Sequence, residues 1–315
     1  MMQFILKRVL WFFPTILAVA GVTFVIMNLT PGSPFQPAGA NNLREDVLKQ
    51  IEKQYGLDKP LPVRFVIYLG KAVRGDFGES YARRPQKVND IMRRSIPVSL
   101  HLGAMALALA TVGGLILGVL AAVNQNGIID YFSSIFAILA FSVPSFVLGI
   151  LLLLLFVIWI PEWTGWRFFR VGGWDSPRDW ILPTIALGAG PFAQLARYTR
   201  SSMIDVIRSD YVRTARAKGL AEQKVILKHV LKNALIPVIT LIGPLFAALG
   251  TGSFFVEQVF RVPGIGKFFV TSMSTKDHPM IMAVVLLYGV FLAVMNLVVD
   301  VLYGVIDPRI RLGGE

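Results

Sequence analysis

Few side chains in this sequence could do acid–base, nucleophilic or metal chemistry. There are no cysteines, so disulfides, thiolate metal sites and a cysteine nucleophile are excluded. The three histidines, His101, His229 and His278, lie far apart in the chain. No His-Glu-x-x-His motif, nucleophile elbow or pair of carboxylates accompanies them. We therefore expect no catalytic residue and no metal site in this chain.

A nucleotide site is also not expected. The segment Gly264-Ile265-Gly266-Lys267 resembles part of a phosphate-binding loop, but Phe268 follows where that loop needs Ser or Thr. The upstream glycine of the motif is missing as well. This chain therefore has no ATP site of that kind and no resident cofactor is predicted.

The composition indicates a membrane protein. Hydrophobic residues make up 55% of the 315 residues and charged residues only 16%, with a mean hydropathy of +0.62. That apolar content is more than one water-soluble core needs, which disfavours a soluble enzyme. The net charge of +12 is typical of nucleic-acid partners in soluble proteins. Here much of the positive charge lies in loops between apolar runs, so no nucleic-acid partner is predicted.

Six long apolar runs predict six transmembrane helices in an all-α membrane protein. A helix needs about 20 residues to cross a bilayer, and each run is close to that length or longer. The fully charged residues inside the runs are Asp130, Arg197 and Asp300, all near run ends, where they can reach the interface. The runs are residues 10–28, 97–123, 128–160, 181–198, 235–256 and 280–305.

The charges next to these runs orient the chain. Lys7 and Arg8 precede the first run, which places the N-terminus, and after six crossings also the C-terminus, in the cytoplasm. Residues 1–96 then form the first helix and a small extracytoplasmic subdomain. Residues 97–305 form a five-helix membrane core, and residues 306–315 form a cytoplasmic tail.

The outer subdomain is predicted to be helical. Leu43, Val47, Ile51 and Tyr55 recur every four residues, and Gly56 can end that helix. A second short helix is expected at residues 63–72. The pattern leaves open whether this insertion only shields the membrane core or docks a partner.

The segment 199–234, called the inner loop below, is the most informative. Met203, Ile207, Tyr211 and Ala215 recur every four residues, which predicts an amphipathic helix. Gly219 follows Lys218 where a helix needs a left-handed cap, so the chain should turn there.

A second amphipathic helix is expected after the turn at Gly219. Its sequence has two rows at four-residue spacing. The cationic row is Lys224, Lys228 and Lys232, and the apolar row is Leu227, Leu231 and Leu235. A pair of basic amphipathic helices fits either a groove in a partner protein or an anionic lipid surface, and the pattern leaves both open.

Residues 210–220 and the continuation Asn233-Ala234-Leu235-Ile236-Pro237 form a recognisable motif in the inner loop. This motif resembles the cytoplasmic EAA loop of binding-protein-dependent ABC importer permeases, and its residues are most similar to those of the oligopeptide, dipeptide and nickel branch. Further motifs fit the same branch, and they are residues 30–35, 75–78, 144–146, 263–266 and 300–311. Within the general EAA pattern only Ala215 and Gly219 match, because Arg213 and Thr214 stand where the pattern has Glu and Ala.

The resemblance implies a type I ABC importer permease in the cell (inner) membrane that imports oligopeptides. The alternatives are dipeptides or a nickel chelate. It implies a second homologous permease, two ATPase subunits carrying the ATP and magnesium, an extracytoplasmic substrate-binding protein and surrounding lipid. It also implies that the inner loop contacts an ATPase subunit. The expected contact residues are Arg213, Thr214, Ala215, Arg216, Lys218, Gly219, Leu220, Glu222, Lys224 and Lys228.

The fifth run is the first candidate for a pathway wall, because Gly243 and Pro244 would loosen a helix that leads directly from the inner loop. The candidate pathway residues are Thr240, Gly243, Pro244, Thr251 and Ser253. Two other classes of function stay open. One is a stand-alone channel or carrier whose inner loop binds lipid, and the other is an intramembrane enzyme, which would need convergent polar groups within the apolar runs.

Overall fold

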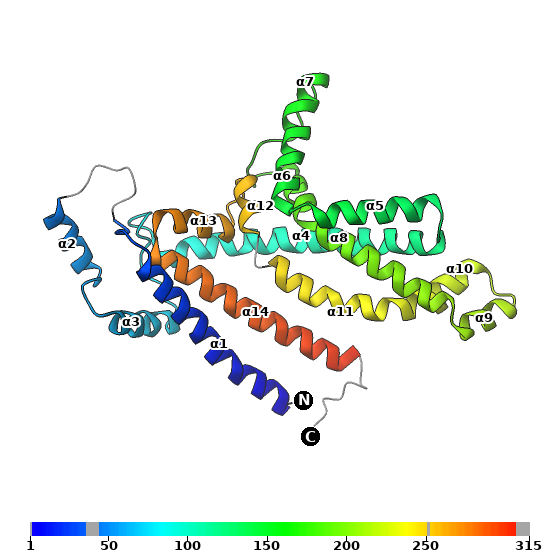
Figure 1. Cartoon of the computed structure of the whole chain (residues 1–315), viewed down its shortest axis with the longest axis horizontal. Helices are drawn as coiled ribbons and strands as arrows, with labels where there is room; N and C mark the ends of the chain where they lie inside the picture. Colours follow the sequence, from blue (N-terminus) through cyan, green and yellow to red (C-terminus); the bar gives the residue numbers. More distant parts are fainter. Residues whose placement is uncertain (1, 36–43, 251–252, 307–315) are drawn as a thin grey trace. The chain divides into compact units, whose positions relative to one another are not determined.

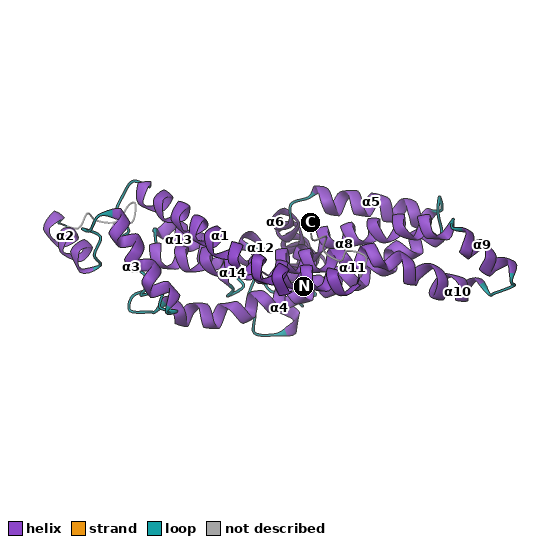
Figure 2. Ribbon diagram, turned by 90° about the horizontal axis from the view of Figure 1, so that it is seen from below, coloured by secondary structure: helices purple, strands orange, loops and turns teal. Residues whose placement is uncertain are grey.

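The computed structural model describes residues 2–35, 44–250 and 253–306, and nearly all of them are helical (Figure 2). No strand occurs in these ranges apart from one isolated antiparallel bridge between Glu79 and Lys87. The helices lie in the order α1 (Met2–Leu29), α2 (Glu45–Gln54), α3 (Leu61–Val73), α4 (Val88–Val123), α5 (Ile128–Ser142), α6 (Ser145–Leu153), η1 (Leu154–Trp159), α7 (Ile160–Thr164), α8 (Pro177–Ile207), α9 (Asp210–Ala217), α10 (Glu222–Lys224), η2 (Val225–Val230), α11 (Leu231–Gly250), α12 (Phe254–Val259), α13 (Ile265–Thr275) and α14 (His278–Ile306) (Figure 1).

Five helical segments of the described chain are long and apolar enough to cross a membrane. They are Leu6–Leu29, Val88–Val123, Ser145–Thr164, Glu222–Gly250 and His278–Val301. The all-α membrane class is confirmed. The count of six crossings stays a prediction, because the fourth run lies in α8, which is not one of these five segments.

The third apolar run is not one helix, so that prediction was wrong. The chain leaves the helical conformation at Val143, with φ −88° and ψ 121°, and a new helix begins after Pro144. A proline disfavours the α conformation in the residue before it, which explains the break. The fifth run is interrupted as well, since α11 ends at Gly250 and α12 begins at Phe254.

Both helices expected in the outer subdomain are present as α2 and α3. Gly56, which follows the C-cap residue Tyr55 of α2, has φ +68°, as its predicted capping role requires, and Pro62 lies in the first turn of α3. Leu43, the first residue of the predicted apolar row, lies outside the described residues.

The described chain forms two compact units. The first unit comprises residues 1–99 and 263–294, and the second comprises residues 100–262 and 295–315. The separation into 1–96, 97–305 and 306–315 concerns which segments lie in the membrane and stays a prediction.

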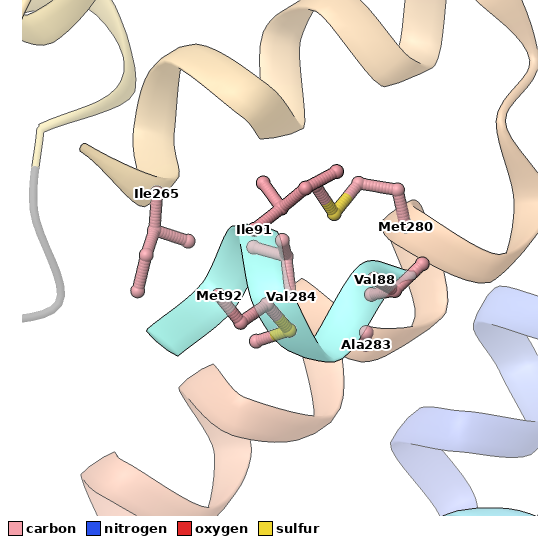
Figure 3. Close-up of a cluster of buried hydrophobic side chains, with 7 residues drawn as sticks. All are labelled: Val88, Ile91, Met92, Ile265, Met280, Ala283 and Val284. Atoms are coloured by element: carbon pink, nitrogen blue, oxygen red, sulfur yellow. The ribbon is translucent and has the colours of Figure 1, made fainter. Parts of the chain in front are cut away.

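The first unit is held together by two apolar clusters. In one cluster the first turns of α4 pack against α13 and α14 (Figure 3). Its members are Val88, Ile91, Met92, Ile265, Met280, Ala283 and Val284. In the other cluster α1 and α14 meet α3, with Phe24 and Met282 among the buried residues.

Asp277 fastens the loop before α4 to the corner between α13 and α14. Its fully buried carboxylate accepts hydrogen bonds from the Ser80 hydroxyl and from the backbone N–H groups of Tyr81, at 2.9 Å, and Ala82, at 3.4 Å. Hydrogen bonds of this kind offset the cost of burying a charge.

The second unit is built on close helix contacts at glycines. A Cβ atom on Gly118 would lie 2.6 Å from the carbonyl oxygen of Ala196, and one on Gly103 would lie 2.6 Å from that of Leu249. The backbone of α4 therefore packs directly against α8 and α11, as small residues allow in membrane helices.

Gly103 provides a direct test of this packing. We expect Gly103→Ala to lower the free energy of unfolding by about 2 kcal/mol, because the methyl group meets backbone atoms that have no rotamer to change. Gly190→Ala is the matched control, since a methyl group at Gly190 would meet no atom within 4 Å. Thermal unfolding in detergent should show a loss at Gly103 only. Equal behaviour of the two variants would contradict the close contact.

Candidate functional site

The inner loop continues two long helices of the second unit. Helix α8 runs through the fourth apolar run into the loop and ends at Ile207, and the chain returns through α10 and η2 into α11. Figure 1 shows α9 and α10 at the end of this helical pair. Any force on the loop is therefore applied to both helices.

The first amphipathic helix is broken in two, so its prediction as one helix was wrong. Ser209 has an extended backbone, with φ −70° and ψ 151°, and its hydroxyl donates to the carbonyl of Val206 at 2.6 Å. Serine competes in this way with helical hydrogen bonds and favours a helix start. The break also moves the buried face, so that Val212 is buried whereas Tyr211 is 44% exposed.

The predicted turn at Gly219 is confirmed. Gly219 has φ +74°, and its N–H donates to the carbonyl of Arg216 at 2.9 Å. The N–H of Leu220 donates to the carbonyl of Ala215 at 3.4 Å, and its side chain packs on the cluster that contains Ala215. This is a Schellman cap, in which a left-handed glycine lets the chain reverse.

The second amphipathic helix is present, but only part of its predicted apolar row is buried, because Leu231 and Leu235 pack against buried clusters and Leu227 does not. Leu227 is 63% exposed, whereas Val225, Val230 and Ala234 are buried. Residues Val225–Val230 form a π-helical segment, whose wider turn changes the buried spacing from four residues to five. The cationic row lies on the more accessible side of the helix and does not contribute to the buried face.

A small core holds the helices of the inner loop together. The buried members of this core are Ala122, Met203, Val212, Ala215, Val225, Val230 and Ala234. Two hydrogen bonds add to it, from the Ser202 hydroxyl to the carbonyl of Ala234 and from the Asn233 amide to the Tyr211 hydroxyl, both at 2.8 Å. The loop is therefore a packed structure rather than a flexible linker.

An ion pair crosses the turn at Gly219. The guanidinium of Arg216 donates to both carboxylate oxygens of Glu222, at 3.1 and 2.6 Å. These hydrogen bonds raise the pKa of Arg216 above its ordinary value. Both side chains are substantially exposed, so the pair orients the turn but adds little stability.

The ten residues predicted to contact an ATPase subunit fall into a buried and an exposed group. Ala215 is buried in the loop core, and Leu220 is half-buried against it. The other eight form an exposed, mainly basic surface, here called the basic face: Arg213, Thr214, Arg216, Lys218, Gly219, Glu222, Lys224 and Lys228. Their contact with an ATPase subunit stays a prediction.

One interaction that positions the loop was not predicted from the sequence. Arg200 on α8 donates to both carboxylate oxygens of Asp130 at the start of α5, with 2.7 Å for the Nη2 bond. The second oxygen of Asp130 also accepts the N–H of Asn126 at 2.9 Å. Asp130 is 4% exposed, so the pair joins α5 to α8 where the inner loop begins.

The candidate pathway residues that the structure describes lie within α11 or at the start of α12. Helix α11 continues through Gly243 and Pro244, and a Cβ on Gly243 would lie 2.3 Å from Val299, so this glycine allows a close helix contact. The Thr240 hydroxyl donates to the carbonyl of Pro237 at 2.6 Å, and the Ser253 hydroxyl accepts the N–H of Val256 at the start of α12. Thr251 lies outside the described residues. A pathway role for these residues stays a prediction.

The fold resembles solved transporter structures. One is described as the crystal structure of an amino acid ABC transporter with histidines, with a TM-score of 0.52, 15% identity, and coverage of 68% of this chain and 92% of that chain. Another is described as inward-facing conformations of the MetNI methionine ABC transporter, with a TM-score of 0.51, 16% identity, and coverage of 69% and 96%. At these identities the likeness shows the fold alone.

Similar proteins match nearly the whole chain. The dipeptide transport system permease protein DppB of Bacillus subtilis is 44% identical, with 99% of each chain covered. The oligopeptide transport system permease protein OppB of Haemophilus influenzae is 41% identical, with 99% of this chain and 100% of the relative covered.

Two family models match the sequence. The model of the binding-protein-dependent transport system inner membrane component matches residues 114–312, and the model of its N-terminal part matches residues 1–103. The chain belongs to the family of binding-protein-dependent transport system inner membrane components.

Proposed function

We propose that this chain is the permease subunit of an ABC importer for peptides and forms half of the translocation pathway. The observation that carries the proposal is the inner loop, a packed pair of helices with an exposed basic face that continues directly into α8 and α11. The names of the full-length relatives supply the substrate class.

The proposed partners are a second, similar permease, two ATPase subunits that bind ATP and magnesium, and an extracytoplasmic binding protein that delivers the peptide. Closure of the ATPase subunits pushes on the basic face. Because the loop has its own core, the push is transmitted to α8 and α11 rather than absorbed, and the two helices alternate access between the membrane faces.

Oligopeptides are the proposed substrates, with dipeptides or a nickel chelate as the alternatives. Uptake of a labelled tetrapeptide, a labelled dipeptide and a labelled nickel chelate by the native host, each compared with a strain that lacks this chain, separates them. We expect loss of the chain to reduce tetrapeptide uptake most. A larger loss of dipeptide uptake would move the assignment to dipeptides, and loss of nickel uptake alone would contradict peptide import.

The contact itself is testable because the chain contains no cysteine. We expect Lys218→Cys to cross-link to an ATPase subunit through a short bifunctional reagent, since Lys218 is exposed beside the turn of the inner loop. Lys49→Cys on α2 is the control, because it is also exposed but lies in the first unit. Cross-linking from Lys49 alone would place the ATPase contact elsewhere.

A further inference from the structure

Helix α3 (Leu61–Val73) has three different faces around its axis. The first face packs on α1 and α14 through Phe65, Tyr68, Leu69 and Ala72. The second face is apolar and exposed, with Val63 46%, Val66 67% and Val73 87% accessible. Gly70 lies on this exposed face, and a Cβ there would meet no atom within 4 Å. A helix that buries one apolar face in the protein and exposes another has a surface that water does not favour.

The third face of α3 lines a cavity. Arg64, Ile67, Tyr68 and Lys71, at the i, i+3, i+4 and i+7 spacing of one helix face, line a cavity of about 510 Å³. Its apolar walls come from the last turns of α1 and the first turns of α14, through Phe24, Met27 and Met282. Those turns are the ends of two helices that are long and apolar enough to cross a membrane, so we expect the cavity at the level of the bilayer surface.

Two hydrogen-bond donors at this cavity lack partners in the described chain. The Arg64 guanidinium makes no hydrogen bond or ion pair there, although its carbon lies 5.9 Å from the centre of the Phe24 ring. Partial burial of Arg64 lowers the pKa of its guanidinium from the ordinary value. The buried hydroxyl of Tyr68 has no partner among the described residues. Arg64 is only partly buried, and the charge of Glu52 attracts it. A partly desolvated cation beside an unpaired donor is a costly arrangement that a bound anion would relieve.

The cavity also carries acidic groups. Asp76 and Glu79 belong to its lining, and one Asp76 oxygen accepts the N–H of Gly78 at 3.0 Å. A bound molecule would therefore meet cations along α3 and carboxylates on the following loop. This charge arrangement suits a group that carries a phosphate with an ammonium attached, as the ethanolamine headgroup does.

We propose that α3 lies in the membrane interface with its exposed apolar face against acyl chains, and that the cavity beside it holds a phospholipid headgroup with its phosphate at Arg64 and Lys71. Two observations select a lipid as the occupant. The cavity walls are the ends of membrane-crossing helices, and the exposed apolar face is on the same short helix as the basic residues. Basic residues beside an apolar helix face are typical of helices that lie in the interface.

The position of α3 is tested by single cysteines carrying an environment-sensitive fluorophore. Val66→Cys and Val73→Cys report on the exposed apolar face, and Lys49→Cys on α2 is the water-exposed control. In vesicles of phosphatidylethanolamine and phosphatidylglycerol, we expect brominated acyl chains to quench both α3 labels, while aqueous iodide quenches only the control. Quenching of the α3 labels by iodide, or by neither agent, would overturn the proposal, since water or another protein would then cover this face.

The headgroup site is tested by lipid retention in native mass spectrometry of the full chain in mild detergent with added phosphatidylethanolamine. We expect Arg64→Gln to lower the retained lipid about tenfold, because one charge-assisted contact is lost. Arg74→Gln is the control beside the same helix, because Arg74 is exposed and does not line the cavity. Arg64→Lys should retain part of the binding. Equal lipid retention by all variants would overturn the lipid site. Displacement of the lipid by tetra-alanine would also overturn it and would assign the cavity to peptide. Neither result bears on the contact between the inner loop and an ATPase.

Discussion

Replacing Arg200 with methionine should lower the free energy of unfolding of the purified chain by about 2 kcal/mol. The substitution leaves the Asp130 carboxylate, 5% exposed at its side chain, without its counterion. The expected cost is below that of a fully buried pair because the Arg200 side chain is 30% exposed. Thermal unfolding in detergent measures this loss.

Two further variants isolate the Asp130–Arg200 pair. Arg208→Met removes an arginine at the end of the same helix that takes no part in the pair, and it should change the stability little. Adding Asp130→Asn to Arg200→Met removes the unpaired charge and should restore part of the loss. Two results would mean that the pair does not join α5 to α8. One is an equal loss of stability in Arg200→Met and Arg208→Met. The other is a double variant whose loss of stability equals the sum of the losses from Asp130→Asn and Arg200→Met measured separately.

Replacing Gly219 with valine should reduce peptide uptake about tenfold. Its φ of +74° is strained for a β-branched residue by about 1–2 kcal/mol, so the Schellman cap should open and the basic face should lose its shape. The added side chain meets no atom within 4 Å of its Cβ, so crowding does not contribute. Uptake of labelled tetrapeptide by whole cells is the measurement.

Gly219→Asn is the matched control for Gly219→Val. It places a side chain in the same open space, but asparagine enters the left-handed conformation several times more readily than most residues. We expect near-normal uptake from Gly219→Asn, with similar amounts of both variants in the membrane. If valine and asparagine behave alike, the backbone conformation at Gly219 does not control transport.

The architecture was largely predictable because membrane helices leave a strong sequence signal. Long apolar runs indicated the approximate positions of α1, α4, α11 and α14. The break in the third run was also encoded, since Pro144 disfavours a helical Val143, but run length outweighed that local rule in the prediction.

The buried faces of the inner loop were harder to predict. A four-residue period assumes one uninterrupted α-helix, and that assumption fails at two places. Ser209 ends one helix and starts another, and the π-helical segment Val225–Val230 inserts extra residues into a turn. Each change rotates the residues beyond it, which is why Val212 replaced Tyr211 and Val225 replaced Leu227 in the core.

The Asp130–Arg200 pair shows a different limit. In the sequence, Asp130 is one of the few charges inside an apolar run, and Arg200 is one of many basic residues in the inner loop. Their pairing depends on how α5 packs against α8 across a separation of 70 residues, which no local pattern contains. The same reason hides the cavity beside α3, whose walls come from segments far apart in the chain.

The most direct test of the transporter assignment is to purify the tagged chain from its native host in mild detergent and identify what accompanies it. We expect recovery of subunits with ATP-binding motifs and a second permease, together with vanadate-sensitive ATP hydrolysis. Recovery of this chain alone, inactive toward ATP but conducting solutes in liposomes, would contradict the assignment and make the inner loop a gate that binds lipid.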